Sequence, residues 1–165
     1  MTQTIIDHLV VGAAELDRAA KQMQDFIKAE FLAGGKTRQQ STFNALKYLH
    51  KKKGISKVLI HDAARPNFSL KLLNNLIQSL ENNKAVIPFI KSKDSIKYKI
   101  KNKLFNLNRN NSFLTQTPQA FKYKDLYNLS IKQKNKITDE ATLFIDNKLD
   151  VKFIKGENLN NKITY

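Results

Sequence analysis

Short apolar runs alternate with amphipathic segments along most of the chain. In the amphipathic segments apolar residues recur every three or four positions, as on one face of a helix. The pattern predicts strands over Ile5–Val11, Glu30–Ala33, Lys57–His61, Lys84–Ile90 and Val151–Ile154, and helices over Glu15–Lys28, Thr37–Lys51, Ser69–Glu81, Phe121–Ile131 and Asp139–Asp146. Alternating strands and helices are typical of an α/β fold with a mainly parallel sheet.

The segment Lys91–Asn111 interrupts this alternation. Polar and apolar residues alternate over Ser95–Lys103, and further apolar residues follow it. This pattern predicts a β-hairpin that projects from the sheet. Because a two-stranded hairpin cannot bury its apolar side alone, we expect residues 91–113 to form an arm that contacts a partner surface. No internal repeat or flexible linker divides the chain, so we expect one domain over residues 1–165.

The composition is that of an ordinary globular protein, with 41% hydrophobic and 26% charged residues. The absence of cysteine excludes a disulfide scaffold, a thiol nucleophile and Cys-ligated metal sites. No apolar run approaches the roughly 18 residues of a membrane span, and Asp7, Glu15 and Asp17 are unlike the start of a secretory signal. We therefore expect a cytoplasmic protein without membrane contact, or one of a plastid-type stroma if the gene is eukaryotic.

The net charge of +15 suggests an anionic partner, but its distribution weakens that interpretation. Only four of the 29 basic residues are arginines, and the lysines are spread among many asparagines. Such a composition is typical of an A-rich genome, so we regard nucleic-acid binding as a weaker alternative. Residues 1–30 differ from the rest, because acidic residues there outnumber basic ones.

Polar clusters follow three of the predicted strands, where ligands bind in open α/β sheets. In the first, Gly34–Ser41, the glycine pair permits close approach of a ligand and the next helix offers N–H groups to an anion, although a tight turn explains the glycines equally well. In the second, Asp62 and Arg65 form either a structural ion pair or part of a site. A single carboxylate suffices for magnesium bound together with phosphates. The third cluster is Lys91–Ser95.

Six motifs occur in order: GGKTRQQS, VLIHDAARP, DSIK, TQTPQAF, TDEAT and GENLNNKIT. Together they resemble the 2-C-methyl-D-erythritol 4-phosphate cytidylyltransferase family of non-mevalonate isoprenoid synthesis, clearly from Phe31 to Thr164. The resemblance implies a Rossmann-like nucleotidyltransferase fold whose arm forms a homodimer. It also implies an enzyme that transfers a cytidylyl group from CTP to methylerythritol phosphate, releases pyrophosphate and uses Mg²⁺ or another divalent cation.

The resemblance also assigns expected nucleotide contacts. Gly34, Gly35, Lys36 and Ser41 match the cytosine pocket, largely through backbone contacts. Asp62 matches the carboxylate near the ribose and the magnesium-bound triphosphate, with a catalytic and metal-binding role.

Further roles follow from the remaining motifs. Lys162 matches the catalytic lysine that stabilises the pentavalent phosphate. Arg65 matches the arginine of HDAARP, which holds its loop or the substrate side. Ser95, where the family usually has threonine, and Arg109 are expected to bind methylerythritol phosphate in the partner's active site. Thr117 is expected to join them, although TPQ could equally be a structural strand end.

Two family features have no counterpart in this sequence. No Ala-Ala-Gly-x-Gly-x-Arg loop occurs, since no glycine precedes Gly12, and no Pro-Glu-Asp-Leu segment follows Lys-Ile-Thr. We therefore expect an incomplete nucleotidyltransferase domain with impaired turnover and retained weak CTP binding. The alternative is a non-catalytic α/β nucleotide-binding or assembly module.

Overall fold

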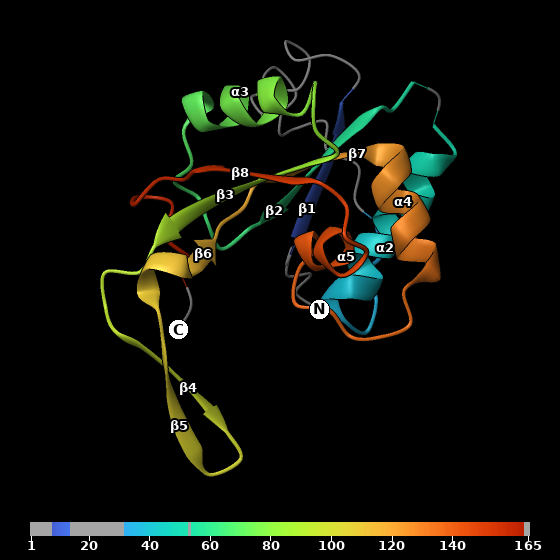
Figure 1. Cartoon of the computed structure of the whole chain (residues 1–165). Helices are drawn as coiled ribbons and strands as arrows, with labels where there is room; N and C mark the ends of the chain where they lie inside the picture. The colour runs from blue at the N-terminus through green and yellow to red at the C-terminus, as the bar shows by residue number, and fades with distance from the viewer. Residues whose placement is uncertain (1–7, 14–31, 53, 164–165) are drawn as a thin grey trace, which may run out of the picture.

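The computed structural model describes residues 8–13, 32–52 and 54–163 (Figure 1). Its main sheet contains β1 (His8–Ala13), β2 (Lys57–Asp62), β3 (Ala85–Lys91), β6 (Phe113–Thr115), β7 (Gln119–Lys122) and β8 (Val151–Lys155). The helices are α2 (Arg38–His50), α3 (Leu70–Ser79), α4 (Tyr123–Lys132) and α5 (Ala141–Asp146). No helix in these ranges is long and apolar enough to cross a membrane.

The sheet is mixed and mostly antiparallel, so the prediction of a mainly parallel sheet is wrong. Its order runs β1-β2-β7-β3, and both β6 and β8 also pair with β3. Among the strand pairs of the described residues, only β3–β8 is parallel; the pairs β1–β2, β2–β7, β3–β7 and β3–β6 are antiparallel. The cause is β7, which lies between β2 and β3 and runs opposite to both. The four residues of β7 directly precede α4. The apolar pattern of β7 continues into that helix, so the sequence predicted one helix over Phe121–Ile131 and no separate strand.

The core lies on both faces of the sheet, because neighbouring strand residues point to opposite sides. Helices α2, α4 and α5 cover one face and α3 covers the other (Figure 1). The first face buries Leu46, Val58, Ile60, Ala85, Ile87, Phe121, Leu126 and Phe144. The second buries Leu59, Leu72, Leu73, Leu76, Leu80, Val86 and Ala120. This alternation fixes the register of β2, which carries Asp62 at its end.

Most predicted elements are confirmed within a few residues. Thr37 caps α2 and accepts a hydrogen bond from the Gln40 backbone N–H, and Ser69 caps α3 as expected. The predicted strand Glu30–Ala33 is wrong where the structure describes it, since residues 32–33 lie in coil. The predicted helix Glu15–Lys28 lies outside the described residues, and only residues 8–11 of the first predicted strand lie within them.

The predicted hairpin is confirmed as β4 (Ile96–Ile100) paired with β5 (Lys103–Leu107), which projects from the main sheet (Figure 1). The rings of Tyr98 and Phe105 stack with centroids 5.2 Å apart. The arm is nevertheless largely exposed, and Leu104 is 71% exposed. Its apolar side chains therefore have little cover from the part of the chain that the structure describes.

Candidate active site

The loop before α2 is held by side chains of the helix's first turn. The Gly35 N–H donates to Ser41 Oγ at 2.9 Å, and the Lys36 N–H donates to Gln40 Oε1 at 2.9 Å. Ser41 Oγ also donates to the Thr37 carbonyl at 3.1 Å. Four residues of the predicted nucleotide pocket (Gly34, Gly35, Lys36 and Ser41) therefore form one compact turn, which we call the nucleotide loop.

Close packing explains why the second glycine position of this loop requires a glycine. A Cβ added at Gly35 would lie 2.4 Å from Gln40 Cγ and 2.5 Å from Gln40 Cβ. At Gly34 the nearest atom would be Ser41 Oγ at 3.3 Å. Gly35 is therefore required by the approach of Gln40, whereas Gly34 tolerates more.

Asp62 lies at the carboxyl end of β2 and pairs with Lys162. The Lys162 ammonium is 2.6 Å from Asp62 Oδ2, and Asp62 Oδ1 accepts from the Ala64 N–H at 3.2 Å. The Asp62 side chain is 12% exposed and that of Lys162 is 46% exposed. Thus the fold brings together the two predicted catalytic residues, which lie 100 positions apart in the sequence.

A buried amide network holds the segment that carries Lys162. Asn160 is fully buried, and its Nδ2 donates to the Thr117 carbonyl at 2.8 Å. The Asn160 carbonyl accepts from Arg65 Nη1 at 2.9 Å and from Gln116 Nε2 at 3.1 Å. The Ile163 N–H also donates to the Ala64 carbonyl at 2.8 Å. Lys162 is therefore tied to the β2 loop from both sides.

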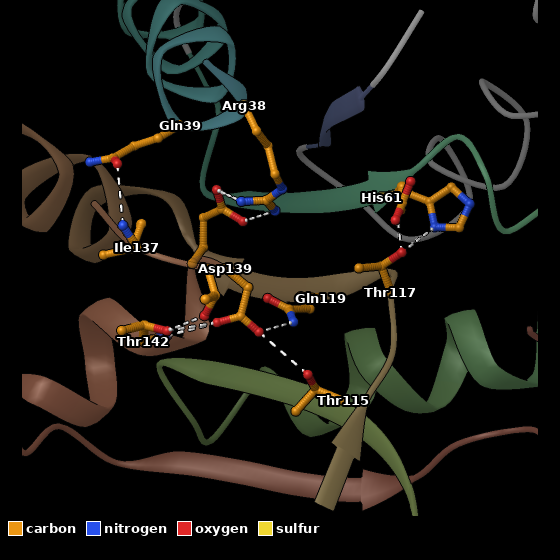
Figure 2. Close-up of polar contacts among 12 residues, drawn as sticks. Arg38, Gln39, His61, Thr115, Thr117, Gln119, Ile137, Asp139 and Thr142 are labelled. Carbon is orange, nitrogen blue, oxygen red and sulfur yellow. Dashed lines mark hydrogen bonds and ion pairs between the residues drawn. The ribbon is translucent and has the colours of Figure 1, made fainter. Parts of the chain in front are cut away.

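His61, Thr117 and the Asp62 backbone form a hydrogen-bonded chain next to this pair, and Figure 2 labels His61 and Thr117. The Asp62 N–H donates to Thr117 Oγ1 at 2.9 Å, and Thr117 Oγ1 lies 3.1 Å from His61 Nδ1. His61 Nε2 is 3.0 Å from the Arg65 carbonyl, an acceptor, so the ring carries its proton on Nε2. Thr117 then donates to His61, which gives this threonine a structural role in the described state.

Burial influences the charge states of the two basic side chains at this hydrogen-bonded network, His61 and Arg65. Desolvation lowers the pKa of His61 below its ordinary value, against the opposing effects of the Arg65 carbonyl and the Asp62 charge. Desolvation also lowers the pKa of Arg65, and the negative charge of Asp62 opposes this shift. An arginine keeps its charge under such shifts, so the site holds a neutral imidazole and a cationic guanidinium.

The donor set fits a magnesium ion that reaches the site together with phosphates. No group of three or more His, Asp or Glu side chains suited to a metal occurs in residues 8–13, 32–52 and 54–163. Magnesium commonly takes one or two carboxylates and completes its shell with substrate phosphates and water. Asp62 is a hard carboxylate donor at the loop edge of the sheet, so the chemistry matches that mode and not a closed protein cage.

The predicted substrate residues of the arm lie elsewhere. Ser95 is exposed immediately before β4, and Arg109 Nη1 donates to the Lys93 carbonyl at 2.9 Å at the base of the arm. The described contacts therefore join Arg65 and Thr117 to the Asp62–Lys162 pair but do not join Ser95 or Arg109 to it. Their role in a partner's site stays a prediction.

Two carboxylates of TDEAT make contacts that the sequence interpretation missed. Glu140 forms a two-pronged ion pair with Arg38 at the start of α2, and Asp139 accepts from Gln119 Nε2. In the sequence, the TDEAT motif was the signal that could have indicated these two carboxylates. Its partners lie 102 and 20 residues away, and no local pattern indicates them.

A pocket of about 230 Å³ adjoins the Arg38–Glu140 pair. Its lining includes Thr37, Gln39, Phe43, Ile137, Glu140 and Leu143. It contains neither Asp62 nor Lys162, so it is distinct from the ion pair at the end of β2.

Comparisons with known proteins find members of one family. The family model described as "IspD: 2-C-methyl-D-erythritol 4-phosphate cytidylyltransferase" matches residues 1–165, and so includes the first thirty. A "Bifunctional enzyme IspD/IspF" of Pelagibacter ubique is 49% identical over 150 residues, which cover 87% of this chain and 40% of that protein. A 2-C-methyl-D-erythritol 4-phosphate cytidylyltransferase of Prochlorococcus marinus is 39% identical over 141 residues, covering 82% and 62% of the two chains.

A solved structure gives the same result. The 4-diphosphocytidyl-2C-methyl-D-erythritol synthase of Anaerococcus prevotii superposes with a TM-score of 0.76 at 35% identity, covering 90% of this chain and 72% of that one. The chain spans less than two-thirds of the length of the curated relatives described above. The family model over the whole chain, the sequence identities and this shared fold together show that the chain belongs to the 2-C-methyl-D-erythritol 4-phosphate cytidylyltransferase (IspD) family.

Proposed function

We propose that this chain supplies the cytidine and catalytic-lysine side of cytidylyl transfer from CTP to 2-C-methyl-D-erythritol 4-phosphate. The observation that carries the proposal is the 2.6 Å contact between Lys162 and Asp62, which places one cation and one carboxylate at the loop edge of the sheet. Nucleotidyl transfer requires positioning and charge stabilisation more than covalent help from the protein. A lysine paired with a carboxylate meets that requirement.

The proposed reaction conserves atoms and charge. An oxygen of the substrate's phosphate bonds to the α-phosphorus of CTP, and the bond from that phosphorus to the oxygen bridging to the β-phosphate breaks. Pyrophosphate leaves with the bonding electrons. Lys162 stabilises the extra negative charge on the α-phosphate oxygens, and Asp62 would hold the metal-bound triphosphate. A bound Mg²⁺ would neutralise part of the phosphate charge.

The nucleotide loop is proposed to bind the cytosine. Gly34, Gly35 and Lys36 present backbone groups, and Ser41 fixes the loop through the Gly35 N–H. The side chain of Lys36 is exposed, which agrees with a contribution made mainly through its backbone. Arg65 keeps the β2 loop in place by its bond to Asn160.

The arm is proposed to pair with a second copy of this chain. Its exposed apolar side chains include Tyr98, Ile100, Leu104, Phe105 and Leu107. Burial of such surface in a like partner would stabilise a dimer through the hydrophobic effect. Ser95 and Arg109 would then reach methylerythritol phosphate in the partner's site, where the guanidinium suits a phosphate.

The deciding experiment measures pyrophosphate release from Mg–CTP in the presence of methylerythritol phosphate. Lys162→Ala should lower the rate about 100- to 1,000-fold, as is common on loss of one transition-state donor. Lys152→Ala, at an exposed position of β8, is the matched control and should change the rate less than about 2-fold. CTP binding by calorimetry without any pyrophosphate release would instead favour the non-catalytic alternative.

A further inference from the structure

Two adjacent carboxylates hold opposite sides of the candidate site. Glu140 contacts Arg38 in the first turn of α2, which follows the nucleotide loop. Asp139 contacts Gln119 and Thr115, which lie in the strands on either side of Thr117 (Figure 2). Both belong to the segment 135–140 between α4 and α5, which we call the bridge. The bridge therefore connects two parts of the site that come from distant stretches of sequence.

The Glu140 contact is buried and two-pronged. Arg38 Nη1 and Nη2 donate to Glu140 Oε1 and Oε2 at 2.9 and 2.5 Å. The Glu140 side chain is 2% exposed and that of Arg38 is 26% exposed. Paired hydrogen bonds between an arginine and a carboxylate fix orientation as well as distance. Arg38 lies directly before Gln39 and Gln40, so the pair fixes the turn whose side chains hold Gly35 and Lys36.

Gln39 attaches the same turn to the bridge a second time. Its Nε2 donates to the Asn135 carbonyl at 3.2 Å, and the Ile137 N–H donates to its Oε1 at 3.4 Å. Figure 2 draws the Gln39–Ile137 contact beside Arg38. The start of α2 is thus joined to the bridge at three points along it: Asn135, Ile137 and Glu140.

Asp139 makes the contacts on the other side. Its Oδ2 accepts from Gln119 Nε2 at 3.0 Å and from Thr115 Oγ1 at 3.4 Å. Its Oδ1 accepts from the N–H and the hydroxyl of Thr142 at 3.1 and 2.9 Å. Thr115 and Gln119 flank Thr117, whose hydroxyl accepts from the Asp62 N–H. The bridge is therefore linked to the strand turn that supports Asp62.

We propose that Asp139 and Glu140 are positioning residues that set the distance between the nucleotide loop and the Asp62–Lys162 pair. This inference rests on the proposed function. CTP must contact both places at once, because its base and its phosphates are ends of one molecule. Two contacts on one ligand strengthen each other only when their spacing matches that ligand. Loss of the bridge contacts should therefore weaken CTP more than it weakens a ligand that uses one place alone.

The test compares Mg–CTP with Mg–inorganic triphosphate in calorimetric titrations of the whole chain. Glu140→Gln should raise the Kd for CTP about 10-fold, and that for triphosphate less than about 2-fold. Asp139→Asn should act in the same direction, and the double variant should lose less than the product of the two single losses, because both residues act through one segment. Glu81→Gln, which removes the carboxylate paired with Lys57, is the control and should leave both affinities unchanged.

Each outcome decides a separate point. If the unaltered chain fails to bind CTP, the proposed function falls and this inference falls with it. If the unaltered chain binds CTP and Glu140→Gln binds CTP equally well, the positioning role is overturned while the proposed function stands. Equal losses for CTP and triphosphate would likewise overturn it, because they indicate general loosening. If Glu140→Gln fails to fold, the milder Gln39→Ala replaces it, and an unchanged ratio of the two affinities overturns the inference.

Discussion

Alanine substitution at the two neighbouring glycines of the nucleotide loop gives a sharp test of the packing argument. Gly35→Ala and Gly34→Ala add the same methyl group one residue apart. At Gly35 the new Cβ would lie 2.4, 2.5 and 2.8 Å from three Gln40 carbons, whereas at Gly34 it would approach only Ser41 Oγ at 3.3 Å. We therefore expect a severe effect at Gly35 and a mild one at Gly34.

The magnitude follows from the atoms involved. Gln40 Cβ belongs to α2 and cannot swing away, so either the loop or the helix turn must shift. That shift breaks the hydrogen bond from the Lys36 N–H to Gln40 Oε1. Overpacking costs about 1–3 kcal/mol and one hydrogen bond about 0.5–1.5 kcal/mol. Gly34→Ala instead restricts the unfolded chain and gains about 0.4–1 kcal/mol, which offsets its small contact cost.

Urea unfolding and Mg–CTP titration measure both consequences. Gly35→Ala should lower the free energy of unfolding by about 2–3 kcal/mol and weaken CTP about 10-fold, and Gly34→Ala should change either quantity little. Gln40→Ala added to Gly35→Ala should recover only part of the loss, because Gln40 Cβ remains. Equal effects of the two glycine substitutions would refute the reasoning.

Three further predictions follow from the same structure. Asp62→Asn should weaken Mg–CTP in calorimetry more than Lys36→Ala does, since Asp62 is proposed to face the metal with its charge and Lys36 to act through its backbone; equal losses would contradict the proposed role of Asp62. Leu104→Ser with Phe105→Ser should convert a dimer to a monomer in light scattering at micromolar concentration, and an unaltered chain that is strictly monomeric with a protease-resistant arm would reject the pairing. Burial lowers the pKa of His61 below its ordinary 6.5, so the contribution of His61 to folding stability should be constant above about pH 6.5 and fall as the pH drops below it; thermal melts of His61→Gln should lack this part of the slope.

Local chemistry made the helices predictable. Thr37 and Ser69 each precede an apolar periodicity, and the structure uses both as N-caps. The arm was predictable for a similar reason, because its alternation of polar and apolar residues differs from the helical periodicity of other segments. Such signals lie within ten residues of one another, so they survive without knowledge of the tertiary fold.

Strand direction was not predictable from the same pattern. An apolar run reads the same in a parallel and an antiparallel strand, and β6 and β7 hold only three and four residues. They pair with β3 on the return from the arm, at registers Phe89↔Thr115 and Ala85↔Phe121. Direction depends on how the chain returns to the sheet, which is a tertiary property.

The residues of the candidate site were likewise predictable from motifs, whereas their contacts were not. The motifs indicated Asp62 and Lys162, but only the fold shows that they touch. Glu140 and Asp139 were visible as two acids in one motif, yet their function depends on Arg38 and Gln119. A buried acid in a sequence of many lysines has too many possible partners for spacing to identify one.

The Asp62–Lys162 pair has a consequence for how the proposed reaction would begin. Asp62 Oδ1 accepts from the Ala64 N–H and Oδ2 contacts the Lys162 ammonium, so a metal ion on Asp62 competes with an existing cation. A magnesium-bound triphosphate would resolve that competition, because it would bring a cation for Asp62 and an anion for Lys162 at once. A free metal ion brings only the cation and would leave Lys162 without its carboxylate. Under the proposed function, this geometry would favour joint binding of metal and nucleotide over binding of the metal first, with Lys162 held on Asp62 until the phosphates arrive.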